Sequence, residues 1–234
     1  RWLWRDADAL VAVSNGLRSY AKETSPDLPI QVISNAIDLS AFTPAPQRDT
    51  NGLVRLLYVG RFNVFKNVET LVEAVGKLSQ MDVGEFELNL VGEGEQRPVL
   101  ERIVSELGLT RRVNFAGWVA RDQIADHYRL ADVFVTATTW EGMPNTVLEA
   151  MACGLPIVGT QASGLHELVR DGLNGYLVPT KDPEALAQAL ARLMGDGYER
   201  RRMGRESRRL AEREFAWEYI AAQYLEVYKQ VERK

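Results

Sequence analysis

The chain has few of the residues that build disulfide frameworks and metal sites. Its 234 residues include one cysteine, Cys153, and two histidines, His127 and His166. A single cysteine excludes an internal disulfide and a thiolate metal site, and it fits the reducing cytosol. No apolar run approaches the roughly 18 residues of a membrane span, and no signal peptide opens the sequence. We therefore expect a cytoplasmic protein.

An excess of charge of one sign is also missing. The 28 Lys and Arg residues against 32 Asp and Glu residues give a net charge of −4, which argues against a dedicated nucleic-acid binder. The hydrophobic fraction of 46% and the charged fraction of 26% are those of a globular protein with a sizeable core. Collagen, coiled-coil, disordered and transmembrane classes are excluded.

Short apolar runs alternate with amphipathic helical segments after Gly52. One helix starts at Asn67, which we predict as its N-cap. Apolar strands that alternate with helices predict an α/β fold: a Rossmann-like parallel sheet with helices on both faces, plus a C-terminal helical segment. Ligands of such sheets bind beyond the carboxyl ends of the strands. The predicted strands are 56–59, 86–91, 113–115, 133–135, 157–158 and 176–178.

The composition divides the chain into four parts. Residues 1–43 carry two short strands and a helix without a methionine start, and we expect them to be the end of a preceding domain. Residues 44–52 contain two prolines and a glycine and are predicted to be a linker. Residues 53–215 form the predicted Rossmann-like domain, and 216–234 a final helix.

The segment 196–214 has seven arginines and five acidic residues. Such a helix is either a basic patch for phosphate or membrane lipid, or a solvated helix face. The interspersed acids favour the solvated face.

Of two loops at predicted strand ends, the first carries groups that suit a phosphate. Arg61 and Lys66 lie where a helix begins, and a helix N-terminus already favours anions, so they form a plausible diphosphate clamp. The alternative is two ordinary surface cations. The next loop, Gly92-Glu93-Gly94, has Arg97 where a dinucleotide fingerprint needs its third glycine, which disfavours a nicotinamide cofactor. Its glycines are expected to permit a tight turn.

The segment 138–150 places two carboxylates beside a helix start. Gly142 and Pro144 argue that Glu141 lies on a loop, while Asn145 or a neighbour caps a helix that holds Glu149. Free backbone N–H groups are expected near Asn145, Thr146 and Val147. Carboxylates that accept from hydroxyls, next to amides that donate to phosphates, suit a sugar nucleotide. Glu149 alone is equally explained by the helix dipole.

The segment Glu141-Gly-Met-Pro-Asn-Thr-Val-Leu-Glu149 resembles the two-glutamate motif of retaining glycosyltransferases of family four, which have the GT-B fold of two Rossmann-like halves. Further segments resemble this family in order and spacing: 33–42, 60–67, 91–94, 113–119, 171–178 and 215–218. The resemblance covers about residues 6–230 and identifies the chain with the C-terminal, donor-binding half.

The resemblance implies a role for each matching residue. Arg61 and Lys66, after Gly60, would hold the donor diphosphate; Glu149 would bind the ribose; Glu141 would bind the transferred sugar. Backbone at Gly117, Trp118 and Val119 would line the base, and the helix start would contribute Gly142, Met143, Asn145, Thr146 and Val147. The catalytic group would be Glu141, Arg61 and Lys66, without a metal or another cofactor.

The resemblance also implies partners and a missing half. The acceptor, a sugar, a lipid or a small molecule, would bind an N-terminal domain that the chain lacks, so transfer is not expected from this chain alone. In the full enzyme, association with the inner membrane surface is compatible with this family. Neither His127 nor His166 matches the family's histidine, and Cys153 is expected to be a small buried hydrophobic residue. A nucleotide-sugar-binding or regulatory module without transfer activity is the alternative.

Overall fold

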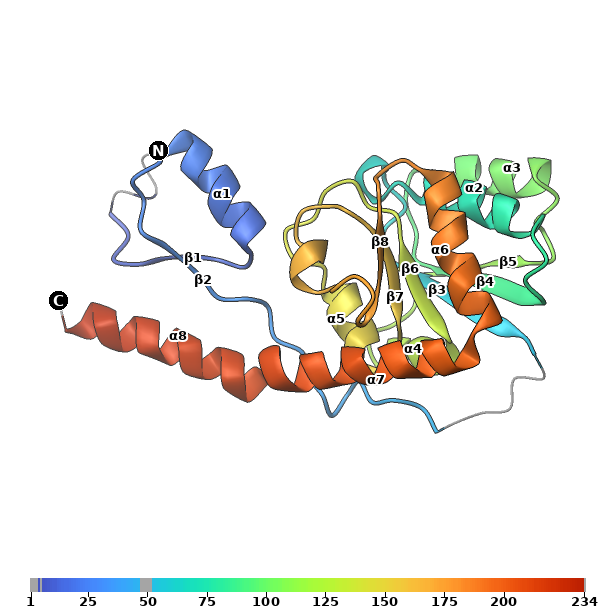
Figure 1. The fold of residues 1–234 in the computed structure, drawn as a ribbon. Helices are drawn as coiled ribbons and strands as arrows, with labels where there is room; N and C mark the ends of the chain where they lie inside the picture. Colours follow the sequence, from blue (N-terminus) through green and yellow to red (C-terminus); the bar gives the residue numbers. More distant parts are fainter. Residues whose placement is uncertain (1–3, 5, 47–51, 234) are drawn as a thin grey trace.

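A parallel sheet of six strands organises the chain (Figure 1). The computed structural model describes residues 4, 6–46 and 52–233. The sheet order is β5-β4-β3-β6-β7-β8, and every neighbouring pair is parallel. This confirms the predicted Rossmann-like fold. The strands are β3 (Val54–Val59), β4 (Phe86–Val91), β5 (Val113–Gly117), β6 (Val133–Thr136), β7 (Ile157–Thr160) and β8 (Gly175–Val178).

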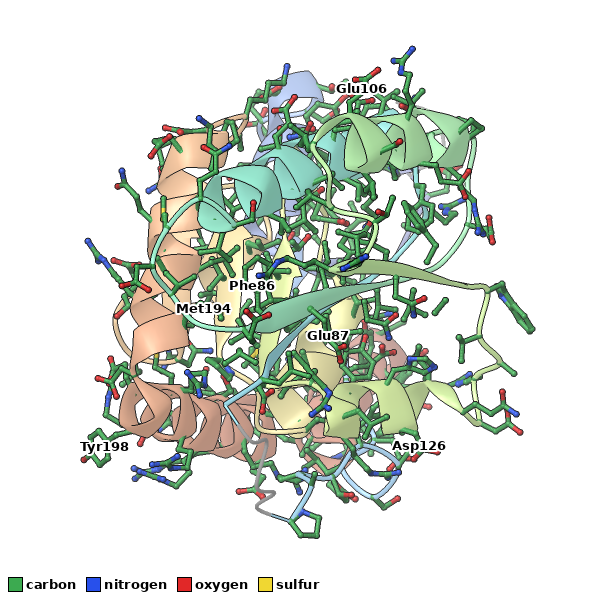
Figure 2. All side chains as sticks on the ribbon, turned by 90° about the vertical axis from the view of Figure 1, so that its right-hand side faces the viewer. Phe86, Glu87, Glu106, Asp126, Met194 and Tyr198 are labelled. Atoms are coloured by element: carbon green, nitrogen blue, oxygen red, sulfur yellow. The ribbon has the colours of Figure 1, made fainter. Side chains whose placement is uncertain are left out.

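Helices cover both faces of the sheet because its central strands are apolar on both sides. On β3, Leu56 belongs to a core cluster with residues of α2, α3 and α6, while Leu57 belongs to a second cluster with residues of α4, α5 and α7. Figure 2 shows Glu106 of α3 and Asp126 of α4 on opposite sides of the sheet. The helices are α2 (Val68–Leu78), α3 (Arg97–Glu106), α4 (Ile124–Leu130), α5 (Asn145–Ala152), α6 (Pro183–Gly195) and α7 (Gly197–Glu214).

The start of α2 differs from the prediction. Asn67 stands at the N-cap position, but its backbone is left-handed, with φ 49°, and its side chain makes no cap hydrogen bond. The side-chain amide instead donates to Thr70 Oγ1 at 2.8 Å and to the Ala137 carbonyl at 3.2 Å. The cause is a short 3-10 helix, η1 (Val64–Lys66), which has Asn67 as its C-cap and turns the chain before α2 begins.

The first residues form a separate small sheet. Strands β1 (Leu10–Ala12) and β2 (Ile30–Val32) pair in parallel and are joined by α1 (Asn15–Thr24). The last helix, α8 (Trp217–Glu232), packs Ile220 and Val227 against Ile33 beside this sheet. The proposed division into domains stays a prediction, and residues 47–51 of the predicted linker lie outside the described residues.

No helix in the described part of the chain is both long and apolar enough to cross a membrane.

Several arginines of α7 donate to backbone carbonyl groups, two of them at the C-termini of helices, where carbonyls lack a partner within the helix. Arg208 donates to the Ala152 carbonyl at the end of α5 at 2.7 Å, and Arg200 donates to the Met194 carbonyl near the end of α6 at 2.8 Å. Arg202 donates to the Gly172 carbonyl at 2.7 Å. These arginines thus fasten α7 to the domain, a structural role that neither sequence interpretation of the basic helix included.

The contact between α7 and the end of α5 depends on a glycine. A Cβ on Gly204 would lie 2.1 Å from the Gly154 carbonyl oxygen, whereas a Cβ on Gly195 in α6 would meet nothing within 4 Å. We therefore expect Gly204→Ala to lower the free energy of unfolding by about 1–3 kcal/mol through overpacking. Gly195→Ala, the matched control, should change it by less than about 0.5 kcal/mol. Thermal melts of both variants test this, and equal melting temperatures would show that α7 can shift to accept a methyl group.

Candidate active site

The sheet order places a topological switch point between the carboxyl ends of β3 and β6. β3 and β6 are neighbours in the sheet, but the strands that follow them in the chain, β4 and β7, lie on opposite sides of this pair. The loops after β3 and β6 therefore run in opposite directions. These loops contact each other directly. The Thr139 amide donates to the Phe65 carbonyl at 2.9 Å, and the buried Thr138 hydroxyl lies 3.0 Å from the same oxygen. This is the place where an open α/β sheet binds ligands.

Lys66 and Glu141 form an ion pair at this switch point, from Nζ to Oε1. Their side chains are 24% and 16% exposed, so the pair is largely shielded from water. The Lys66 backbone is fixed because its amide donates to the Asn63 side chain at 3.0 Å. The structure thus brings together a cation and a carboxylate that the sequence placed on separate loops.

Glu149 lies on α5 and is held from behind by Tyr128 of α4. The Tyr128 hydroxyl donates to Glu149 Oε2 at 2.7 Å. Burial raises the pKa of Glu149 above its ordinary value, although the Tyr128 hydrogen bond and the charge of Arg121 act in the opposite direction. Burial also raises the pKa of Tyr128 well above its ordinary value, so the hydroxyl remains a donor. One Glu149 oxygen is therefore occupied by the protein.

The start of α5 offers two backbone donors rather than three. Pro144 is the N-cap, a neighbour of Asn145 as expected. Within the described residues, the amides of Asn145 and Thr146 donate to no other group, but the Val147 amide donates to the Pro144 carbonyl at 3.1 Å. The prediction of a free N–H at Val147 was therefore wrong, because the first turn of α5 already uses it.

The loop before α5 is covered by the N-terminal segment. The Asn35 side chain donates to Asn145 Oδ1 at 2.8 Å and to the carbonyl of the buried Met143 at 3.3 Å. A Cβ on Gly142 would come within 2.9 Å of Leu17 in α1. Residues of the N-terminal segment therefore fix the path of the loop that carries Glu141.

The remaining predicted site residues lie at the same end of the sheet, where the carboxyl ends of the strands meet. Gly60 and Arg61 follow β3; Arg61 is exposed, and its carbonyl accepts from the Tyr58 hydroxyl at 3.1 Å. Gly117 ends β5 with φ 74°, and Trp118 beyond it is 76% exposed. Val119 is half-buried and packs against the core. Within the described residues, the Arg61 side chain has no hydrogen bond or ion pair.

The glycines after β4 allow two loops to approach closely. A Cβ on Gly92 would lie 1.9 Å from the Gly60 carbonyl oxygen, and one on Gly94 would lie 2.3 Å from that of Phe62. The Phe62 amide donates to the Glu93 carbonyl at 2.9 Å. Glu93 pairs with Arg97, the residue that departs from the dinucleotide fingerprint. These glycines therefore allow the loops after β3 and β4 to pack closely against each other.

Sequence reasoning missed the residues that support the site from other elements. They are Tyr128, Thr138, Asn35 and Asn63. Asn63 could have been found, because it stands three residues before Lys66 at the N-cap of a helical turn. Tyr128 and Asn35 are distant in sequence from the carboxylate and loop that they contact, so no local pattern indicates them.

Among residues 4, 6–46 and 52–233, no group of three or more His, Cys, Asp or Glu side chains could hold a metal ion.

The parallel sheet with helices on both faces is a Rossmann-like domain, the unit of which GT-B enzymes contain two. A family model described as "Glycosyl transferases group 1" matches residues 54–196, which is more than half of the chain. The chain therefore belongs to this family, which confirms the resemblance found in the sequence.

Individual relatives agree with the family. The chain is 31% identical to D-inositol 3-phosphate glycosyltransferase of Xylanimonas cellulosilytica, over 97% of this chain and 60% of that protein. It is also 31% identical to the lipopolysaccharide core biosynthesis glycosyltransferase LpsE of Rhizobium meliloti, over 96% of this chain and 65% of that protein. The chain thus spans less than two thirds of the length of these relatives.

Solved structures show the same fold. Sucrose-phosphate synthase of Thermosynechococcus elongatus matches with a TM-score of 0.87 and 30% identity, over 98% of this chain and 60% of that one. HepE of Anabaena, solved with UDP and glucose, matches with a TM-score of 0.82, over 97% of this chain and 64% of that one. Its identity of 22% supports the fold alone.

The burial of Glu149 makes the stability of the chain depend on pH. The folded-state pKa of Glu149 lies above the ordinary 4.5 of an unfolded chain. Its contribution to stability is therefore fully present below pH 4.5 and is lost as the pH rises through the folded-state pKa. Glu149→Gln removes the buried charge and retains an acceptor for Tyr128. We expect it to raise the melting temperature at pH 7.5 by about 2–4 °C, the shift that 1 kcal/mol produces in a chain of this size.

The gain should shrink toward pH 4.5, where the wild-type carboxyl is increasingly protonated. Glu73→Gln, at an exposed position of α2, is the matched control for the loss of one carboxylate. A Glu149→Gln variant that melts below the wild type at pH 7.5 would contradict the assignment of a destabilising buried charge.

Proposed function

We propose that this chain is the donor-binding half of a retaining glycosyltransferase that moves a sugar from a nucleoside diphosphate sugar to an acceptor. The observation that carries the proposal is the Lys66–Glu141 pair at the switch point of the sheet, with Glu149 on the helix beside it. A cation suits the diphosphate, and the carboxylates suit the hydroxyl groups of the ribose and the sugar.

Each site residue takes one part of the donor in this proposal. Lys66 and Arg61 hold the diphosphate and stabilise the departing nucleoside diphosphate as its charge develops. Glu149 binds the ribose through the oxygen that Tyr128 leaves free, and Glu141 binds the transferred sugar near the reacting carbon. The amides of Asn145 and Thr146 donate to phosphate oxygens at the N-terminus of α5. The backbone from Gly117 to Val119 lines the base.

This charge distribution requires no metal ion. Two cations and a helix N-terminus supply the positive charge that a divalent ion supplies in other phosphate sites. The acceptor, a sugar, a lipid or a small molecule, binds a facing domain, which orients it and excludes water. On this proposal the 234-residue chain binds nucleoside diphosphates and transfers no sugar by itself.

The cations are tested by calorimetric titration of UDP, GDP and ADP, of their sugars, and of the uncharged nucleosides. We expect Lys66→Ala and Arg61→Ala each to weaken binding of the preferred nucleoside diphosphate by about 1.5–3 kcal/mol, because each removes a charge-assisted contact. Nucleoside binding should change much less. Lys77→Ala is the matched control: Lys77 is 42% exposed on α2 and pairs with Glu184. Equal losses for nucleoside and diphosphate would show that Lys66 and Arg61 support the fold instead.

The two glutamates are expected to have different effects. Glu149→Gln should weaken the nucleoside diphosphate and the nucleotide sugar alike, because both contain the ribose. Glu141→Gln should weaken only the additional affinity that the sugar provides. It should leave the bare diphosphate bound equally or more tightly, since Glu141 no longer competes for Lys66. The same titrations measure both variants. If Glu141→Gln weakens the bare diphosphate as much as the nucleotide sugar, its assignment to the sugar is wrong.

A further inference from the structure

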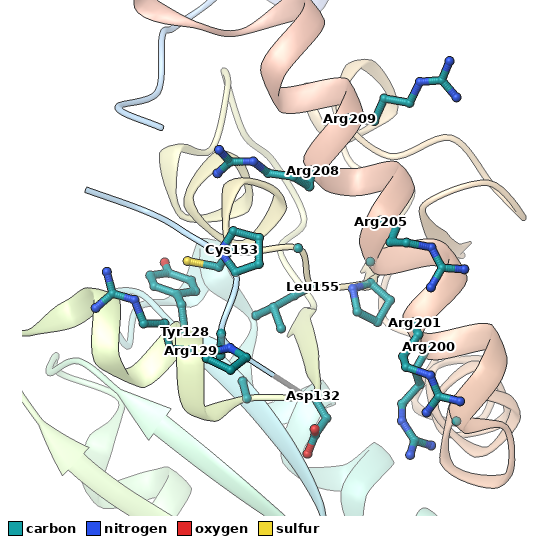
Figure 3. Close-up of a pocket in the computed structure, with 18 of the residues that line it drawn as sticks. Tyr128, Arg129, Asp132, Cys153, Leu155, Arg200, Arg201, Arg205, Arg208 and Arg209 are labelled. Atoms are coloured by element: carbon teal, nitrogen blue, oxygen red, sulfur yellow. The ribbon is translucent and has the colours of Figure 1, made fainter. Parts of the chain in front are cut away.

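A cavity lies at the opposite end of the sheet from Lys66 and Glu141. It has a volume of about 440 Å³ and is bounded by α7, α4 and residues 44–46 (Figure 3). Two of its lining residues, Asp132 and Pro156, directly precede β6 and β7. The cavity therefore opens at the amino ends of these strands, whereas Glu141 and Lys66 lie beyond the carboxyl ends of β6 and β3.

One wall of the cavity is strongly cationic. The whole lining contains six arginines against two acidic residues, Asp132 and Glu212. Five of the arginines come from α7, and Figure 3 shows them along one length of this helix. The arginines are Arg129, Arg200, Arg201, Arg205, Arg208 and Arg209.

Two of these arginines have no partner among the residues that the structure describes. Arg208 and Arg200 donate to backbone carbonyls at the ends of α5 and α6, and Arg129 donates to the Ala41 carbonyl. Within the described residues, Arg201 and Arg205 make no hydrogen bond or ion pair, and both are exposed. They are four positions apart on α7, a spacing at which like charges face each other and repel. Their ten N–H donors, five on each guanidinium, thus remain available to a ligand.

The opposite wall is apolar and recessed. Leu155 is 6% exposed and Cys153 is 4% exposed, and both line the cavity with Pro44 and Pro156. A flat bilayer surface cannot reach side chains this far below the surface, but a small molecule can enter a cavity of this size. The walls together match a ligand with an anionic end and an apolar body.

We propose that this cavity binds a small phosphate-bearing molecule, with the phosphate on Arg201 and Arg205 and the apolar body against Leu155 and Pro156. Guanidinium groups bind phosphate through paired N–H donors, and the anion relieves the repulsion between the two arginines. The site is independent of the proposed donor site, so it stands whether or not the chain binds a nucleotide sugar.

Phenyl phosphate is the probe, since it combines a phosphate with an apolar ring. Calorimetric titration into the 234-residue chain should give a saturable isotherm, and the Leu155 methyl resonances should shift in NMR spectra. The double variant Arg201→Gln/Arg205→Gln should weaken the affinity on the order of tenfold or more. Arg102→Gln/Arg111→Gln removes the same charge from α3 and the loop after it, outside the cavity, and should leave the affinity unchanged.

Further arms identify the ligand chemistry and the site. Lys66→Ala should bind phenyl phosphate as the wild type does, which separates the cavity from the proposed donor site. Inorganic phosphate should bind more weakly than phenyl phosphate, and phenol should give no saturable isotherm. Absence of binding, equal loss in both double variants, or loss in Lys66→Ala overturns the proposal. Arginine-dependent binding to phosphatidylglycerol vesicles without any response to phenyl phosphate also overturns it, in favour of a lipid surface.

Discussion

Burial of β3 on both faces is the constraint on which the rest of the structure depends. Leu56 and Leu57 are each 1% exposed, and they point into different core clusters. A strand that is apolar on both sides needs a helical layer on each face, and β4 and β6 then extend the sheet in opposite directions from it. The loop after β3 consequently meets the loop after β6, and Lys66 reaches Glu141 as a result of this topology.

The strands and most helices could be predicted because their determinants are local. A short apolar run predicted the strand 86–91, and β4 has these bounds, Phe86–Val91. The two-glutamate loop could be placed at a strand end for the same reason. Local preference failed at Asn67 and Val147. At Asn67 the preceding 3-10 turn sets the backbone, and at Val147 the Pro144 carbonyl uses the amide.

The contacts that complete the site come from distant residues and could not be predicted from a single sequence. Tyr128 precedes Glu149 by 21 positions, and Asn35 precedes Asn145 by 110. Tyr128 is also packed between aromatic rings: it lies edge-on to Phe42 at 5.8 Å and stacked with Phe134 at 5.9 Å between centroids. A ring packed in this way has little freedom to turn, so Glu149 is held by a rigid donor. Composition gave no indication of this arrangement.

The Lys66–Glu141 pair has a consequence for selectivity among anions. In the unliganded chain each of these groups already has a partner of opposite charge. A simple anion that takes Lys66 leaves Glu141 shielded from water and without its cation, which costs free energy. A molecule that presents a phosphate to Lys66 and a hydroxyl group to Glu141 satisfies both at once. Glu141, the counter-ion of Lys66 within the protein, therefore disfavours small inorganic anions, because they would leave Glu141 unpaired. This selection adds to any contact that favours the larger ligand.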